Sequence, residues 1–375
     1  MNITVITATY NEKGNIERLI SILEEEIFPK IKNHKMSILV VDDNSPDGTG
    51  EVVKRLMGNW KNLHISQGPK NGLGAAYIRG MTYAVDKLNA DLMFEIDADL
   101  QHDPHKIPQF IEKIEQGSDM VVGNRYSDGG SIPENWPLTR RIFSQVANFF
   151  VRTVFTKFSI HDWTGGYRAI KKEVFLKEKS ELTNFTGYIF QISFLHKAVR
   201  DGFRIGEVPF NFTDRTMGDS KIAPFSYIMD VVSYVIISRI KELLFGKFGK
   251  FLVVGGLGFI INYVLLRIFK ESYRWDASLA NLVGAAAAIF SNFNLNNFWT
   301  FKDGKITGVT SYFLKLVQFY LTSAFGVIFI QTGAILLGDK LIGDKYYIEY
   351  FVIGTMLLLI WNFAIYSLVI WKKKT

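Results

Sequence analysis

The hydrophobic pattern divides the chain into two parts. From residue 1 to about residue 220, short apolar runs alternate with charged stretches, whereas residues 248–371 are mostly apolar. The first pattern is typical of a globular domain with strands and amphipathic helices, and the second of membrane-spanning segments. With 375 residues the chain is long enough for a domain of about 200 to 250 residues and a separate membrane domain.

The first part predicts an α/β fold. Short strand candidates are separated by segments with helical spacing, such as Asn15 to Glu26. This alternation predicts a mostly parallel sheet with helices on both faces. Ligands bind at the carboxyl ends of the strands in such sheets, so the residues after each strand are the first candidates for a site. The predicted strands are Ile3 to Ala8, Ser37 to Val41, Leu63 to Ser66, Leu92 to Ile96 and Met120 to Val122.

An apolar stripe at helical spacing runs through residues 136–158, beside Arg140, Arg141 and Arg152. The stripe fits a core-facing helix, and it also fits a helix lying in the membrane interface. The apolar part that follows favours the interface. We expect a second interfacial helix and linker at 223–246, between a first domain at 1–222 and a membrane domain at 247–375. The stripe consists of Trp136, Leu138, Ile142, Phe143, Val146, Phe149, Phe150 and Val154.

Four apolar stretches of the membrane domain are each long enough to cross a hydrocarbon core of ~30 Å as a helix, which takes ~20 residues. Aromatic residues lie near their ends, as membrane interfaces favour. An even number of spans returns the chain to its starting side. The stretches are Phe248 to Phe269, Ala277 to Phe298, Tyr312 to Leu337 and Tyr347 to Trp371.

Basic residues predict the orientation of these spans. Ten lie in the segments on one side and five in the loops on the other. Since cytoplasmic segments carry the excess of Lys and Arg, we expect a multi-pass protein of the cell membrane with both termini and the first domain in the cytoplasm. The first residues lack the basic and apolar regions of a signal peptide, which agrees with this prediction. The ten are Arg239, Lys241, Lys247, Lys250, Lys302, Lys305, Lys315 and Lys372 to Lys374, and the five are Arg267, Lys270, Arg274, Lys340 and Lys345.

Composition limits the chemistry. The chain has no cysteine, which excludes disulfides, thiolate metal sites and a cysteine nucleophile. Its net charge of +7 suits nucleic acid, anionic lipid or a phosphate-rich substrate. Because the basic residues follow the membrane boundary, we expect a lipid bilayer and phosphate groups as partners, and no nucleic acid.

Two carboxylates follow the fourth predicted strand. Asp97, Ala98 and Asp99 come directly after the apolar run Leu92 to Ile96, and Gln101 follows two residues later. Residues two apart at an extended strand end face the same way, so Asp97, Asp99 and Gln101 can converge on one hard cation. Mg²⁺ or Mn²⁺ there would bridge diphosphate oxygens. A solvated acidic turn is the alternative, and the polar ends of the other strands favour the cation site.

The second predicted strand also ends in acids. Asp42 and Asp43 are followed by turn residues at 44–48. A carboxylate there can accept hydrogen bonds from a nucleobase or ribose, while capping of the next helix is the structural alternative. We expect one of the pair to recognise the base. The segment Lys70 to Gly74 resembles a phosphate-binding loop only loosely, and its glycines are expected to allow close packing.

Five motifs along residues 1–225 resemble, in order, those of family 2 glycosyltransferases of the dolichyl-phosphate mannose synthase type. They are Thr9-Tyr10-Asn11-Glu12, Val41-Asp42-Asp43-Asn44-Ser45, Asp97-Ala98-Asp99-Leu100-Gln101-His102, Gly123-Asn124-Arg125-Tyr126 and Asp214-Arg215-Thr216-Met217-Gly218-Asp219-Ser220-Lys221. As a set they are highly specific. The membrane part, with Phe251 to Gly255 and Asn292 to Phe301, resembles the four-helix GtrA-type domain. The resemblance implies a GT-A type α/β domain followed by an all-α four-helix transmembrane domain.

The resemblance also implies a reaction and a set of site residues. The reaction is inverting transfer of mannose from GDP-mannose to dolichyl or another polyprenyl phosphate, with Mg²⁺ or Mn²⁺ as cofactor. Guanidinium groups suit phosphate oxygens, and lysine supplies a point charge. The implied roles are nucleotide-sugar binding by Tyr10, Glu12, Val41, Asp43, Asp97, Ala98, Asp99, Arg215 and Lys221, metal ligation by Asp99 and Gln101, lipid-phosphate binding by Arg125, Arg140 and Ser144, and catalysis by Asp97, Asp99 and Arg125.

Two positions depart from the family pattern. Ala8 stands where proline is common, and Ser193 stands where relatives often carry glutamate. A sugar hydroxyl needs a carboxylate base, but a phosphate monoester is already an anionic nucleophile, so Ser193 favours a phosphate acceptor. Two alternatives remain open. One is a polyprenyl-phosphate glucosyltransferase that uses UDP-glucose, and the other is a lipid-linked sugar translocator, which the few intramembrane charges disfavour.

Overall fold

The computed structural model describes residues 1–133, 135–182, 187–213 and 225–372. The chain forms two compact units, Met1–Ile237 and Ser238–Thr375. The division falls within helix α8 (Phe225–Phe245), between the predicted domain limits at 222 and 247.

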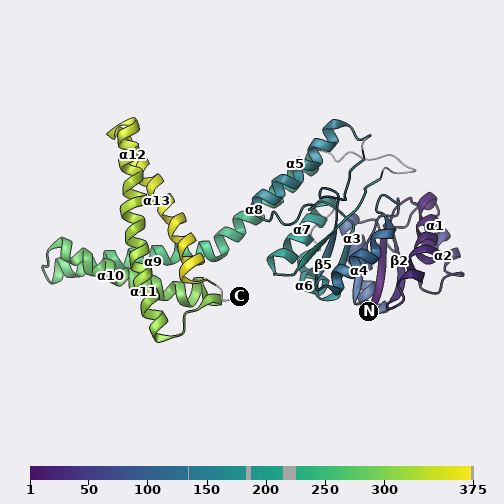
Figure 1. Cartoon of the computed structure of the whole chain (residues 1–375), viewed down its shortest axis with the longest axis horizontal. Helices are drawn as coiled ribbons and strands as arrows, with labels where there is room; N and C mark the ends of the chain where they lie inside the picture. The colour runs from purple at the N-terminus through teal and green to yellow at the C-terminus, as the bar shows by residue number, and fades with distance from the viewer. Residues whose placement is uncertain (134, 183–186, 214–224, 373–375) are drawn as a thin grey trace. The chain divides into compact units, whose positions relative to one another are not determined.

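A seven-stranded sheet flanked by helices forms the centre of the first unit, in the order β3-β2-β1-β4-β6-β5-β7 (Figure 1). The strand β1 pairs in parallel with β2 and β4, whereas β6 is antiparallel to both β4 and β5. The sheet is therefore mixed rather than parallel throughout. The strands are β1 (Asn2–Thr9), β2 (Lys35–Asp42), β3 (Leu63–Gln67), β4 (Leu92–Glu95), β5 (Met120–Asn124), β6 (Arg168–Lys171) and β7 (Ile205–Pro209).

Each face of the sheet has its own hydrophobic core. Along β1, Ile3 and Val5 point to one core and Ile6 points to the other, as the alternation of side chains in a strand requires. The first core is covered by α1 (Lys13–Ser21), α2 (Thr49–Leu56) and α4 (Ile107–Glu115), and the second by α3 (Leu73–Leu88), α6 (Lys172–Leu182) and α7 (Gly187–Arg200). Burying one such aliphatic side chain stabilises the fold by ~1.5–3 kcal/mol.

Helix α3 lies unusually close to the sheet because of one glycine. A Cβ atom at Gly80 would lie 2.7 Å from a methyl of Val41 and 2.8 Å from a methyl of Ile6. Any larger residue would push α3 away from β1 and β2. This close approach holds the middle of α3 against β1 and β2.

The structure differs in two details from the elements that the sequence predicted. The helix predicted over Asn15 to Glu26 begins at Lys13 as α1 and passes after Ser21 into a π-helical turn, η1 (Ile22–Ile27). The strands β6 and β7 were absent from the sequence prediction, because β6 has only four residues and begins with Arg168, and β7 contains a glycine and ends in a proline. Both extend the sheet beyond β4.

A helix, α5 (Leu138–Val154), forms in the segment that was predicted to lie in the membrane interface. Its outer face is strongly apolar and exposed, with Leu138 at 69% and both Phe143 and Phe149 at 63% of full exposure. Ile142 and Val146 of the predicted stripe are exposed as well, at 49% and 55%, whereas three other members face inward. Trp136 is buried, and Phe150 and Val154 pack against the second core.

The second unit is helical. Among the described residues, three helices are long and apolar enough to cross a membrane: Lys247–Ser272, Val309–Ile342 and Val352–Ile370. The remaining predicted span, Ala277 to Phe298, coincides with helix α10 (Ala277–Leu295), which is not one of these three. The sequence of α10 includes Asn292 and Asn294. Within this unit an aromatic cluster is formed by Phe251, Phe293, Phe301, Phe319, Tyr366 and Trp371.

Candidate active site

The polar motifs follow strands that end at one edge of the sheet. The strands β1, β2 and β4 are parallel neighbours, and β5 runs in the same direction as β4 because both are antiparallel to β6. Tyr10, Asp43, Asp97 and Arg125 come directly or shortly after these four strands. The fold therefore brings together four motifs that are up to 115 residues apart in sequence (from Tyr10 to Arg125).

The acids after β2 have different surroundings. Asp42 is fully buried and accepts hydrogen bonds from the backbone and hydroxyl of Ser45 and from Gln67 at 3.2 Å, so it holds the turn together. Asp43 makes an ion pair with Arg79 of α3, with 2.6 Å between Oδ1 and Nη2. Its orientation is thereby fixed at the sheet edge. The structural role belongs to Asp42, which leaves Asp43 as the candidate for nucleotide recognition.

The motif after β1 presents an aromatic ring. The Lys70 ammonium lies 3.3 Å from the centre of the Tyr10 ring, a cation–π contact between the β1 motif and the glycine-containing segment before α3. Glu12 accepts a hydrogen bond from Asn15 at 2.9 Å at the start of α1. The side chain of Val41 is buried in the second core, so any contact it makes with a nucleotide is through the backbone.

The two carboxylates after β4 differ in exposure. The side chain of Asp97 is 39% exposed, whereas Asp99 is buried and its Oδ1 accepts the backbone N–H of Gln101 at 3.1 Å. Gln101 Nε2 donates to the carbonyl of Thr213 at 3.1 Å. Within the described residues no group of three or more His, Asp or Glu is arranged to hold a metal. Two carboxylates and an amide oxygen are nevertheless the hard-oxygen donor set that Mg²⁺ and Mn²⁺ favour.

His102 belongs to this site but was not a sequence candidate. Its Nδ1 accepts the backbone N–H of Asp97 at 3.1 Å, and its ring stacks on Tyr167 with 5.1 Å between ring centres. Burial lowers the pKa of His102 to about 4, against the opposing effect of the Asp99 charge, so the imidazole is neutral at physiological pH. A neutral ring is also what the accepted hydrogen bond requires. The sequence signal was its place as the last residue of the Asp97 to His102 motif.

Behind the β4 motif, a buried acid lies opposite a buried arginine. Glu95 of β4 stands opposite Arg168 of β6, and both are fully buried. Burial raises the pKa of Glu95 to about 7, although the charge of Arg168 acts in the opposite direction. Ser193, the position that departs from the family pattern, is also fully buried, and its hydroxyl donates to the carbonyl of Phe190 in the same helix. No carboxylate base occupies that position.

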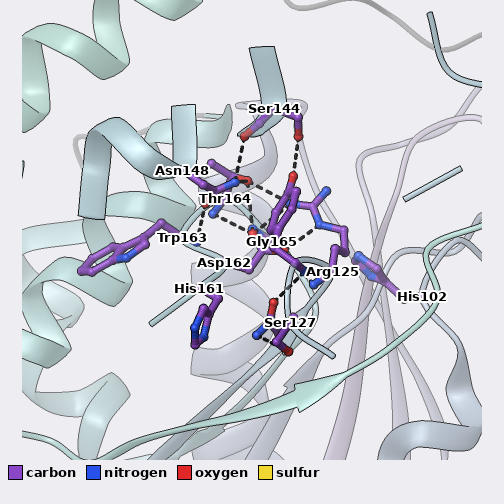
Figure 2. A network of polar contacts seen from close by, with 12 residues as sticks. His102, Arg125, Ser127, Ser144, Asn148, His161, Asp162, Trp163, Thr164 and Gly165 are labelled. Atoms are coloured by element: carbon purple, nitrogen blue, oxygen red, sulfur yellow. Dashed lines mark hydrogen bonds and ion pairs between the residues drawn. The ribbon is translucent and has the colours of Figure 1, made fainter. Parts of the chain in front are cut away.

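Arg125, after β5, is held by a buried acid (Figure 2). Its Nε and Nη2 donate to the two oxygens of Asp162 at 2.7 and 2.9 Å, and Nη2 also donates to the hydroxyl of Thr164 at 2.9 Å. Burial would raise the pKa of Asp162, but the Arg125 charge and the hydrogen bonds outweigh it and hold the pKa below its ordinary value. Asp162 and Thr164 were not sequence candidates, because an Asp before Trp-Thr-Gly-Gly is typical of a turn.

The other predicted lipid-phosphate residues lie on or beside α5. The Ser144 hydroxyl is hydrogen-bonded to the phenol of Tyr126, the neighbour of Arg125. The Arg140 guanidinium lies 3.7 Å from the Trp136 ring. Ser144 is thus brought to the Arg125 region, while Arg140 stacks on an aromatic ring at the start of the helix. Arg215 and Lys221 lie outside the described residues.

Comparisons with known proteins agree with this arrangement. The family model of glycosyl transferase family 2 matches residues 4–177, and that of the GtrA/DPMS transmembrane domain matches residues 250–371. The second match and the three apolar helices show that the chain is a membrane protein.

Curated relatives match over most of their length. A dolichol-phosphate mannosyltransferase of Pyrococcus furiosus is 33% identical over 332 residues, which cover 88% of this chain and 88% of the relative. A polyprenol monophosphomannose synthase of Mycolicibacterium smegmatis is 36% identical over 221 residues, which cover 58% of this chain and 80% of the relative. The crystal structure of glucosyl-3-phosphoglycerate synthase from Mycobacterium tuberculosis covers 64% of this chain and 79% of its own, with 20% identity and a TM-score of 0.43. That structural likeness carries no argument about activity.

Proposed function

Since the chain belongs to glycosyl transferase family 2, we propose that it transfers mannose from GDP-mannose to dolichyl or another polyprenyl phosphate, with inversion at the anomeric carbon. One observation supports the proposal independently of the names of the relatives. The same sheet edge holds a nucleotide-type half, with Tyr10 and Asp43, and a phosphate-type half, with Arg125, and the exposed apolar face of α5 lies on the phosphate side. This arrangement suits a soluble donor and a lipid acceptor.

The proposed reaction is a single displacement. An oxygen of the lipid phosphate attacks the anomeric carbon of mannose, the bond from that carbon to the diphosphate oxygen breaks, and GDP leaves with the electron pair. The acceptor is an anion near neutral pH, so it needs no general base, which agrees with the buried hydroxyl of Ser193. Positioning of the two substrates and stabilisation of charge supply most of the rate.

The residues divide between donor and acceptor. Tyr10, Glu12 and Asp43 would bind the guanosine, and Arg215 and Lys221 the diphosphate. A divalent cation, Mg²⁺ or Mn²⁺, held by Asp99 and Gln101, would neutralise charge on the departing diphosphate. On the acceptor side, Arg125, Arg140 and Ser144 would bind the lipid phosphate, since guanidinium forks and hydroxyls match phosphate oxygens.

A reconstitution tests the donor and the acceptor together. Full-length protein in liposomes is given GDP-mannose or UDP-glucose, with dolichyl phosphate, undecaprenyl phosphate or the unphosphorylated alcohol as acceptor. We expect transfer from GDP-mannose to the phosphates and none to the alcohol. Transfer from UDP-glucose alone would identify a glucosyltransferase instead. Flipping of lipid-linked sugar without transfer would favour a translocator.

We propose that the first unit and both termini face the cytoplasm, on the strength of the ten-to-five distribution of basic residues. The absence of cysteine makes the test direct, because a single introduced thiol has no competitor. In intact cells, a membrane-impermeant thiol reagent should label Ser272→Cys and should spare Lys305→Cys until the membrane is opened. The reverse pattern would invert the orientation.

A further inference from the structure

Asp162 is a charged residue without any exposed surface, and its partners account for its burial. It lies in the segment between α5 and β6, and its side chain is 0% exposed. Besides the two donors of Arg125, it accepts the backbone N–H groups of Thr164 at 3.2 Å and Gly165 at 3.0 Å. A buried carboxylate with this many donors stays ionised and holds its partners in one arrangement.

The segment around Asp162 is itself fixed from the side of β7. Glu207 accepts the backbone N–H of His161 at 2.7 Å and that of Asp162 at 3.3 Å. Its other oxygen accepts from the amide of Asn124, the last residue of β5, at 3.0 Å. Asp162 is therefore anchored to the same strand end that carries Arg125.

A second chain of contacts runs from this segment to α5 (Figure 2). Asn148, on the buried face of the helix, accepts the backbone N–H of Trp163 at 2.7 Å and donates to the carbonyl of Ser144 at 3.0 Å and to the hydroxyl of Thr164 at 3.3 Å. Thr164 thus contacts both Arg125 and Asn148. The guanidinium and the helix that carries Ser144 share one buried support.

We infer that Asp162 is a positioning residue for the lipid-phosphate site: it sets the plane of the Arg125 guanidinium and, through Thr164 and Asn148, its placement relative to Ser144. The inference rests on the proposed function, in which Arg125 and Ser144 receive the phosphate. A role of Asp162 in net charge and a role in orientation predict opposite changes in phosphate binding. Asp162 cancels the charge of Arg125, so removing its charge would strengthen phosphate binding if net charge alone mattered, and would weaken it if orientation matters.

The test is Asp162→Asn in full-length protein in liposomes, with separate KM values for dolichyl phosphate and GDP-mannose. Asparagine keeps the shape but presents an amide N–H to the Arg125 donors. We expect the KM for dolichyl phosphate to rise at least tenfold and that for GDP-mannose to stay within twofold. The matched control is Asp119→Asn, which removes the acid of the Asp119–Lys171 pair (3.2 Å) next to the other end of β5. It should lower thermal stability without changing either KM.

Three results would overturn the inference. They are an unchanged KM for dolichyl phosphate, a lower KM, which would favour net charge, and equal rises in both KM values, which would show only a general loss of structure. If Asp162→Asn does not fold, Thr164→Val tests the same support, because it removes the bridging hydroxyl and leaves the Arg125–Asp162 pair. A several-fold rise in the KM for dolichyl phosphate is expected, and no rise refutes the inference. A wild type that neither binds nor uses dolichyl phosphate would instead refute the proposed function.

Discussion

Replacing His102 by glutamine should flatten the dependence of stability on pH between pH 8 and pH 5. An ordinary histidine titrates at about 6.5, whereas the buried His102 has its pKa lowered to about 4. Below pH 6.5 the unfolded chain binds a proton that the folded chain refuses, so acid favours unfolding. The stability that neutral His102 contributes is complete above pH 6.5 and is lost as the pH falls toward 4.

The size of the effect follows from the two pKa values. Each unit of difference corresponds to ~1.4 kcal/mol, so a separation of about 2.5 units gives roughly 3 kcal/mol in total. At pH 5, roughly 2 kcal/mol of this is lost relative to pH 8. For a unit of 237 residues (Met1–Ile237), this corresponds to a Tm shift of about 4–8 °C.

The assay is thermal unfolding of the full-length protein in detergent, followed by tryptophan fluorescence from pH 8 to pH 5. His102→Gln lowers stability at pH 8, because stacking on Tyr167 is lost, so the comparison is between slopes and not absolute Tm values. His105→Gln is the control with the opposite sign. Hydrogen bonds to Glu26 and Asp103 raise the pKa of the exposed His105, so its contribution is present at low pH and lost as the pH rises through the folded pKa. Parallel Tm curves for wild type and His102→Gln would refute the reasoning.

Three further predictions concern the metal, the core and the membrane face. Asp99→Asn should reduce transfer at least a hundredfold at unchanged Tm, and excess chelator should reduce transfer by the wild type as strongly. Full activity in either experiment would show that the reaction needs no cation. Gly80→Ala should cost about 1–3 kcal/mol of unfolding free energy, measured by denaturation, because its methyl meets Val41 and Ile6 at under 3 Å; an unchanged stability would show that α3 shifts freely. Phe143→Glu should lower transfer to lipid in liposomes but leave GDP-mannose binding intact. Loss of both would show that Phe143 is needed for folding and not for contact with lipid.

The sequence predicted the strands that carry the motifs, because they are β-branched runs ended by polar turns. It did not predict β6, since a buried Arg168 looks like a solvent-exposed position until Glu95 is placed opposite it across the sheet. The prediction of a mostly parallel sheet is confirmed, and the antiparallel pairings of β6 were not predicted for the same reason. Pairing between strands is decided by tertiary contacts that local pattern does not contain.

The site residues, too, were predicted only in part. Sequence reasoning placed Tyr10, Asp43, Asp97 and Arg125 at one edge, because each follows a strand. It could not identify Asp162, whose role depends on a contact with a residue 37 positions earlier. The strand pattern alone left the choice between Asp42 and Asp43 open, and only the family resemblance named Asp43; hydrogen bonds from Ser45 and Gln67 assign the turn to Asp42.

The antiparallel strand β6 separates the sheet into two halves. On one side lie β1, β2 and β4 with the nucleotide-type motifs, and on the other lie β5 and β7 with the support of Arg125. At ~4.8 Å per strand spacing, the ends of β4 and β5 are about 10 Å apart, with the start of β6 between them. Among the described residues, strand pairing joins the two halves through β6, and both hydrophobic cores extend across them. A change of side-chain volume at β5 can therefore reach β1 and β2 through the shared cores, although no strand pairing joins β5 directly to them.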